Sequence, residues 1–210
     1  MPLPCFSDIC AVVVTTGQHD ISPILESLRP FAQTVVWDNS KEKRNAKVYG
    51  RYLAVSRSQH DLIYVQDDDA IIDLQAFASA LSIYRDGEIL CNMPREWADA
   101  PCYQGPIRLV GWGALFHRRL VNFQTYLDRY PLDDLFLREC DRVFTGLNTC
   151  RNIDVPRLSL PYAFDRSRMG CEERHGQDLY TIKHRLESLK VDQQGKIRDT
   201  LEVRMGGAVA

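Results

Sequence analysis

Three short apolar runs stand out in residues 1–90, and polar residues follow each of them directly. The runs are AVVVT, TVVW and LIYV, at residues 11–15, 34–37 and 62–65. Short runs that are rich in β-branched and other apolar residues are typical of buried strands. The pattern therefore predicts three buried strands that each end at a polar cluster.

Helical segments separate these strands. Ser22 and Pro23 are typical of a helix start, and Pro30 is typical of its end. Residues 49–53 indicate a second helix, and Asp73 is suited to cap a third one that carries apolar side chains at helical spacing. The alternation predicts an α/β fold with a mostly parallel central sheet flanked by helices.

Polar residues follow all three predicted strands at the same end. Thr15 ends the first strand, Asp38 follows the second, and Asp67, Asp68 and Asp69 follow the third. In parallel sheets covered by helices, ligands bind beyond the carboxyl ends of the strands. We therefore expect these side chains to point into one ligand-binding crevice.

The rest of the chain is less regular. We expect strands at residues 88–92 and 108–116 and a loop at 97–106. Helices are expected at residues 131–144 and 177–189. The resulting order still fits one sheet with helices on its faces.

Composition is that of an ordinary globular protein. Of the 210 residues, 45% are hydrophobic and 26% are charged, which suffices for one domain with its own core. We expect this domain to span residues 1–195 and residues 196–210 to form a flexible tail. The net charge of −2 gives no general attraction to nucleic acid. A group of arginines after residue 100 leaves DNA open as a partner: Arg118, Arg119, Arg138, Arg142, Arg166 and Arg168.

Cysteine usage and the absence of targeting signals indicate the compartment. The seven cysteines form no CxxC pair, which favours free thiols in a reducing cytosol over a disulfide framework or a zinc site. Residues 1–10 have no basic flank of the kind that signal peptides carry, and no run of about eighteen apolar residues is present. We therefore expect a cytoplasmic protein without a membrane span.

The aspartate run at residues 67–69 is the strongest chemical signal. Adjacent carboxylates at the end of a buried strand repel one another unless a cation neutralises them. Oxygen ligands suit Mg²⁺ or Mn²⁺, which typically keep coordination sites open for phosphate oxygens. The alternative is a helix N-terminus with acidic residues that the helix dipole stabilises. The position after a buried strand favours metal and diphosphate binding.

The segments AVVVTT, TVVWDNS and LIYVQDDD together resemble the nucleotide-sugar half of GT-A glycosyltransferases, in particular exostosin-like enzymes with a DDD form of the DxD motif. The resemblance implies a single GT-A, Rossmann-like domain over residues 1–195. Its nucleotide-sugar half would be residues 1–90 and its acceptor-side half residues 91–195. The short chain is similar to compact bacterial or bacteriophage-encoded transferases, for which the location would be the host cytoplasm.

On the donor side, the resemblance implies one role for each strand end. Thr15 and Asp38 would contact the nucleobase and ribose of a nucleotide sugar, with a UDP-sugar expected. Asp67 would lie near the ribose, and Asp68 would belong to the same donor-binding group. Asp69 would bind the metal, Mn²⁺ or Mg²⁺, which bridges the diphosphate.

Basic residues follow the second predicted strand. Arg44 and Lys47 lie in the segment KEKRNAK and can add positive charge next to a diphosphate. The alternative is a solvated basic turn without a ligand. The sequence leaves both interpretations open.

On the acceptor side, the resemblance rests on shorter motifs. The segment GWGALF resembles the glycine-containing acceptor-side strand, which implies acceptor contacts for Trp112 and Gly113. Trp112 can stack on an acceptor ring or can be a core tryptophan. His175 resembles the metal-ligating histidine near the C-terminus of the family, and His184 is its competitor.

The segment Glu139–Cys140–Asp141 resembles the acidic position on the helix behind the acceptor pocket. It makes Asp141 the candidate general base of an inverting transfer, because a hydroxyl needs a positioned carboxylate to take its proton. Exostosin-like enzymes have two adjacent acids here, whereas Arg142 follows Asp141. Glu139 is therefore the alternative base.

The expected function is transfer of a sugar from a nucleotide sugar to a hydroxyl of a glycan, a protein or a modified DNA base. A nucleotidyltransferase is the first alternative, but TTGQHD lacks the glycine-rich phosphate loop of that class. A non-catalytic nucleotide- or carbohydrate-binding module is the second alternative. Uncompensated carboxylates argue against it, since they are costly without a bound ion.

Overall fold

A computed structural model of the chain describes residues 4–98, 100, 103, 105–161 and 176–190. Its central sheet has six strands in the order β2-β1-β3-β6-β5-β7. The strands are β1 (Ile9–Thr15), β2 (Gln33–Asp38), β3 (Leu62–Asp67), β5 (Glu88–Asn92), β6 (Ala114–His117) and β7 (Thr149–Ile153). All of them run parallel except β6, which is antiparallel to β3 and β5. The predicted α/β fold with a mostly parallel sheet is confirmed.

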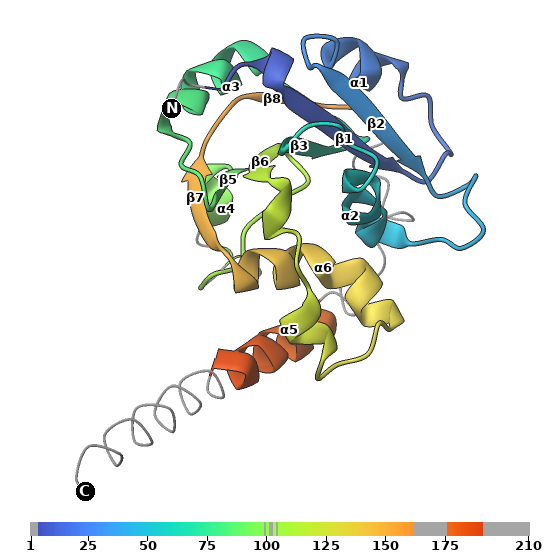
Figure 1. The fold of residues 1–210 in the computed structure, drawn as a ribbon, viewed down its shortest axis with the longest axis vertical. Coiled ribbons are helices and arrows are strands. Elements are labelled where there is room, and N and C mark those ends of the chain that lie inside the picture. The colour runs from blue at the N-terminus through green and yellow to red at the C-terminus, as the bar shows by residue number, and fades with distance from the viewer. Residues whose placement is uncertain (1–3, 99, 101–102, 104, 162–175, 191–210) are drawn as a thin grey trace, which may run out of the picture.

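Helices cover both faces of this sheet, with α1 and α3 on one side and α2 and α6 on the other (Figure 1). The α-helices are α1 (Ser22–Ser27), α2 (Gly50–Val55), α3 (Leu74–Ala80), α4 (Arg95–Ala98), α5 (Gln124–Leu127) and α6 (Asp134–Leu147). Residues 176–190 are also helical. Short 3₁₀ turns are η1 (Phe6–Asp8), η2 (Lys47–Tyr49), η3 (Leu81–Ile83) and η5 (Arg118–Leu120).

Strand β1 shows why the sheet needs both helix layers. Cys10 and Val12 lie in one core cluster with residues of α2 and α6, whereas Ala11 and Val13 lie in a second cluster with residues of α1 and α3. Successive side chains of a strand point to opposite faces, so a continuous apolar run requires a cover on each face. Full burial of one such valine side chain contributes about 1.5–3 kcal/mol.

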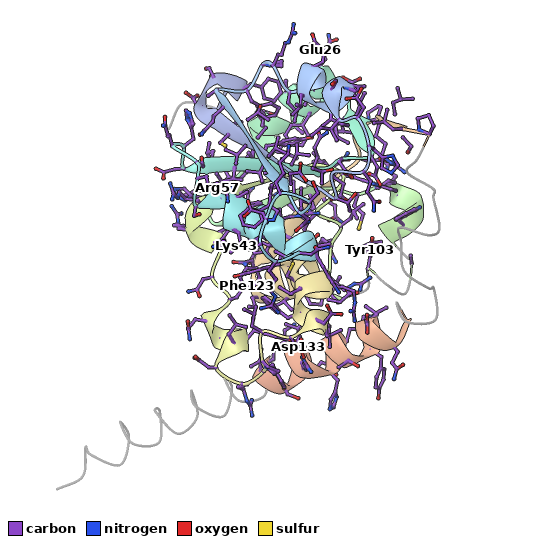
Figure 2. The ribbon with its side chains drawn as sticks, turned by 90° about the vertical axis from the view of Figure 1, so that its right-hand side faces the viewer. Glu26, Lys43, Arg57, Tyr103, Phe123 and Asp133 are labelled. Atoms are coloured by element: carbon purple, nitrogen blue, oxygen red, sulfur yellow. The ribbon has the colours of Figure 1, made fainter. Side chains whose placement is uncertain are left out.

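Figure 2 shows Glu26 of α1 near the top and Asp133, the residue before α6, far below it. Asp133 caps α6, because its carboxylate accepts a hydrogen bond from the Phe136 N–H (2.8 Å). Asp73 caps α3 in the same way through the Ala76 N–H (3.0 Å), as predicted. These caps fix where α6 and α3 begin.

Some boundaries differ from the prediction. The strand expected at 108–116 begins only at Ala114, because residues 111 and 112 form a turn. The helix expected at 131–144 spans Asp134–Leu147. The loop expected at 97–106 overlaps the last residues of α4.

Three strands were not predicted. They are β7 and the antiparallel pair β4 (Ala70–Ile72) and β8 (Arg157–Ser159). The expected tail, residues 196–210, lies outside the described residues.

Two smaller expectations concern thiols and membranes. The described cysteines are free thiols, as expected: Cys5, Cys10, Cys91, Cys140 and Cys150. Within the part of the chain that the structure covers, no helix has the length and apolar character needed to cross a bilayer.

Candidate functional site

The carboxyl ends of β1, β2 and β3 lie side by side at one edge of the sheet. Thr15 of β1 is paired in register with Asp38 of β2, and its neighbour Val14 is paired with Asp67 of β3. Backbone register therefore brings together the three polar positions that the sequence placed at the strand ends. The expected convergence on one edge is found.

Thr15 and Asp38 also organise the turns at this edge. The Thr15 hydroxyl accepts a hydrogen bond from the Gly17 N–H (3.0 Å). The Asp38 carboxylate accepts from the Ser40 N–H (3.0 Å) and hydroxyl (2.6 Å) and pairs with Lys41 (2.9 Å). The Ser40 hydroxyl, and after it Lys41, hold the pKa of Asp38 below its usual value. Asp38 is therefore an ionised acceptor at neutral pH.

Asp67 is fixed from two sides. Its backbone N–H donates to the carbonyl of Gly111 (2.6 Å), and its carboxylate forms an ion pair with Arg51 of α2. A Cβ atom on Gly111 would collide with the Asp67 carboxylate. The glycine that precedes Trp112 thus allows this carboxylate to lie against the turn before β6, a role that the sequence did not reveal.

Arg51 joins Asp67 to the candidate base. The Arg51 side chain is only 2% exposed, and its Nη1 lies 3.1 Å from the Asp141 carboxylate of α6. Burial opposes the charge of Arg51, but the carboxylates of Asp141 and Asp67 outweigh it and raise the Arg51 pKa. Tyr52 donates a hydrogen bond to the other Asp141 oxygen (2.7 Å). Sequence reasoning missed Arg51 and Tyr52, because their partners lie far along the chain.

The two candidate bases on α6 point to different surroundings. Burial raises the pKa of Asp141, although Arg51 opposes this shift. Glu139 forms a buried ion pair with Arg142 instead, and burial raises its pKa as well. Residues two apart on a helix lie on roughly opposite faces. Of these two acids, Asp141 is the one that contacts the network of the strand ends.

The basic segment after β2 is held by Asn39. The side-chain oxygen Oδ1 of buried Asn39 accepts from the Ala46 N–H (2.9 Å), and its side-chain Nδ2 donates to the Lys47 carbonyl (3.2 Å). Lys47 pairs with Asp134 of α6, so its charge is engaged within the chain. Arg44 is exposed in this loop. Of the two basic candidates for a diphosphate, the structure leaves Arg44 with the more accessible side chain.

Trp112 lies in an aromatic and cationic contact group. The Arg157 guanidinium is 3.7 Å from the centroid of the Trp112 ring, and the Trp97 ring is 4.4 Å away. These contacts occupy much of the ring that an acceptor sugar would need. The geometry favours a packing role for Trp112 over an open stacking platform.

Gly113 has a backbone role. Its φ of +101° lies in the region that side chains disfavour, and its carbonyl accepts from the Asn92 N–H (2.7 Å). The buried Asn92 side chain donates to the Trp112 carbonyl (2.8 Å) and accepts from the Val155 N–H (2.8 Å). Asn92, another residue that the sequence did not reveal, ties the Gly-Trp-Gly turn to the end of β5.

The predicted metal ligands are only partly covered by the structure. Asp68 is buried, Asp69 is half-buried, and the Asp69 carbonyl accepts from the Leu160 N–H (2.8 Å). Across the described ranges, no three His, Cys, Asp or Glu side chains form a metal-binding group. A site that shares a divalent ion with diphosphate oxygens needs only one or two carboxylates, which this turn offers. His175 lies outside the described residues, and His184 is exposed on the 176–190 helix.

The arginines that left DNA open are used inside the chain wherever they are described. Each has a partner: Arg118 donates to the Ser58 carbonyl, and Arg119, Arg138 and Arg142 pair with Asp86, Asp178 and Glu139. Arg166 and Arg168 lie outside the described residues. The described members of this group are thus engaged in contacts within the chain, and Arg119 keeps a side chain that is 52% exposed.

No protein-family model and no curated protein sequence matches the chain. Among solved structures, it is similar to S. aureus TarS 1–349, with 15% identity, a TM-score of 0.47, and coverage of 86% of this chain and 72% of that chain. It is also similar to Aq1419 from Aquifex aeolicus VF5, with 11% identity, a TM-score of 0.46, and coverage of 71% and 87%. A197 from STIV has 11% identity, a TM-score of 0.44, and coverage of 72% and 85%. These likenesses concern the arrangement of elements alone.

Proposed function

We propose that the chain is a metal-dependent glycosyltransferase that moves a sugar from a UDP-sugar to a hydroxyl acceptor. One observation carries the proposal: Thr15, Asp38 and Asp67 gather at the carboxyl ends of three adjacent parallel strands, next to the Asp68–Asp69 turn. Ligands of such sheets bind at this edge. The resemblance of the same three segments to GT-A enzymes supports the choice of a nucleotide sugar.

On the donor side, Asp38 offers an ionised acceptor for hydroxyl or N–H groups of the ribose or base, and Thr15 lies beside it. Asp67, held by Arg51, contributes an oriented carboxylate near the ribose. The oxygen donors of Asp69 and Asp68 suit Mg²⁺ or Mn²⁺, which would neutralise charge on the leaving diphosphate.

On the acceptor side, Asp141 is the proposed general base. The acceptor oxygen attacks the anomeric carbon, the bond from that carbon to the diphosphate oxygen breaks, and the acceptor proton moves to the Asp141 carboxylate. Burial raises the pKa of Asp141, which favours proton uptake. A single displacement of this kind inverts the anomeric configuration. The proposed acceptor is a hydroxyl of a glycan, a protein or a modified DNA base.

Hydrolysis of nucleotide sugars without an acceptor tests the proposal. The protein is incubated with a panel of UDP-, GDP-, CMP- and dTDP-sugars and Mn²⁺, and release of the nucleotide is measured. We expect release from UDP-sugars that Asp69→Asn abolishes and that the control Glu88→Gln retains, since Glu88 pairs with Arg151 at the start of β5. Metal-dependent UDP binding without hydrolysis or transfer would favour a binding module, and absence of both would contradict the proposal.

A further inference from the structure

Arg51 is a buried cation shared by two carboxylates that belong to different parts of the fold. Asp67 is the last residue of β3, at the donor edge, whereas Asp141 lies in the middle of α6. Arg51 Nη2 pairs with Asp67 and Nη1 lies 3.1 Å from Asp141, with the Arg51 side chain 2% exposed. A single guanidinium therefore lies between the donor half of the sheet and the acceptor-side helix.

The position of Arg51 is fixed by its neighbours in α2. A Cβ atom on Gly50 would collide with the Trp37 ring of β2, so the start of α2 lies directly against the sheet. Tyr52, the next residue, is 4% exposed and donates to Asp141 (2.7 Å). Because the backbone is held at both positions beside Arg51, its guanidinium has little freedom to follow one carboxylate away from the other.

The Arg51 bridge also separates two negative charges. Asp67 and Asp141 carry the same charge and would repel each other across a poorly solvated gap without Arg51. The planar guanidinium can address two carboxylates at once, whereas a lysine ammonium is a compact point charge. A change at either carboxylate thus alters the ion pair between Arg51 and the other carboxylate.

We propose that Arg51 is a positioning residue that couples the two halves of the site, so that the affinity for a nucleoside diphosphate depends on Asp141. This inference rests on the proposed function. Coupling between sites is reciprocal, so donor binding at Asp67 in turn adjusts the placement of Asp141. The proposed base is thereby aligned when the donor is present.

Calorimetric titration of UDP with Mn²⁺ tests the coupling. Asp141→Asn should weaken UDP binding by about fivefold or more, because the charge of Arg51 is then balanced by Asp67 alone, which weakens the acceptor that this carboxylate offers to the ribose. In an Arg51→Met background, the same Asp141→Asn change should have no further effect. Arg51→Lys should also abolish the coupling, although it keeps the charge.

Glu88→Gln is the matched control, because Glu88 also pairs with an arginine, Arg151 (2.9 Å), but is the first residue of β5, at the opposite end of the parallel strands. It should leave UDP affinity unchanged. If Arg51→Met does not fold, Arg51→Lys, which keeps a positive charge, replaces it as the background for Asp141→Asn. Tyr52→Phe should give a smaller loss than Asp141→Asn.

Thermal unfolding tests the bridge without a ligand. The effects of Asp67→Asn and Asp141→Asn on the melting temperature should be non-additive by about 2–4 °C or more. Additive melting shifts, or a UDP affinity that Asp141→Asn leaves unchanged, would overturn the coupling while metal-dependent UDP binding keeps the proposed function intact. A wild-type protein that binds no UDP would overturn both.

Discussion

The donor edge at the ends of β1, β2 and β3 and the region formed by α6 and the Gly-Trp-Gly turn are built in different ways. At the donor edge, backbone register alone brings Thr15, Asp38 and Asp67 together. On α6, the acids Glu139 and Asp141 lie two residues apart and have different partners, because the turn of the helix directs only Asp141 toward Arg51. The sequence therefore predicts which polar residues lie together at strand ends more directly than it predicts the partners of acids on a helix.

The largest expected difference between the two acids of α6 is in turnover. Asp141→Asn should lower kcat by about 10²–10⁴, as removal of a positioned base does. Glu139→Gln should leave the kcat of the folded protein nearly unchanged and should lower only its stability, since Glu139 pairs with Arg142. Steady-state assays with a competent acceptor measure both. Equal losses, or a product whose NMR spectrum shows a retained anomeric configuration, would end the assignment of Asp141 as an inverting base.

The next largest effect is expected at the contact between Gly111, in the turn before β6, and Asp67 at the end of β3. Gly111→Ala places a Cβ atom against the Asp67 carboxylate and should displace it. Overpacking costs about 1–3 kcal/mol, and a cost of this size that falls on donor binding corresponds to a loss of about five- to 150-fold in UDP affinity. Gly176→Ala is the control, because a Cβ there has open space. Unchanged UDP affinity in Gly111→Ala would separate Asp67 from donor binding.

Asp38 tests the donor edge by itself. Asp38→Ala should weaken UDP and uridine alike by about tenfold or more, since hydrogen bonds to a charged group contribute about 1.5–3 kcal/mol. Ser40→Ala removes the internal partner of Asp38 but keeps its carboxylate, and should have a smaller effect. Uridine affinity that survives in Asp38→Ala would mean that Asp38 does not contact the nucleoside.

Arg44 should give the smallest effect. This exposed residue can add charge next to a diphosphate, so Arg44→Ala should weaken UDP binding only slightly, by about 0.2–1 kcal/mol. The loss should disappear in about 1 M salt, where charges are screened within about 3 Å, and uridine should bind unchanged. A loss that is equal for uridine would assign the effect to the loop conformation.

Sequence patterns predicted the convergence of polar residues at the ends of β1, β2 and β3 because these signals are local. Each buried strand contains a contiguous apolar run, and a polar residue follows that run directly, as Asp38 does, or after one further residue, as Asp67 does. Asp73 as the cap of α3 is likewise read from adjacent residues. The α/β fold follows from the alternation of such strands with helices along residues 9–80.

The remaining parts depend on contacts that are distant in sequence. In the sequence, Arg51 does not differ from an ordinary helix residue, because its partner Asp141 lies 90 positions further along the chain. Strand β7 contains polar positions, and only its pairing with β5 identifies it as a strand. Gly111 and Asn92 act through close approach of side chains to the backbone, which a single sequence does not display. For Trp112 the sequence left a stacking role and a packing role open. The contacts of its ring with Arg157 and Trp97 favour the packing role.

Metal-dependent UDP binding tests the central claim most directly. Calorimetric titrations of UDP into wild-type protein, Asp69→Asn and the control Glu88→Gln are compared with and without Mn²⁺. We expect Mn²⁺ to strengthen UDP binding in the wild type and in Glu88→Gln and to have no effect in Asp69→Asn, with all three proteins equally folded. Identical UDP affinity with and without Mn²⁺ in the wild type, or full metal dependence in Asp69→Asn, would contradict the aspartate cluster as the donor site.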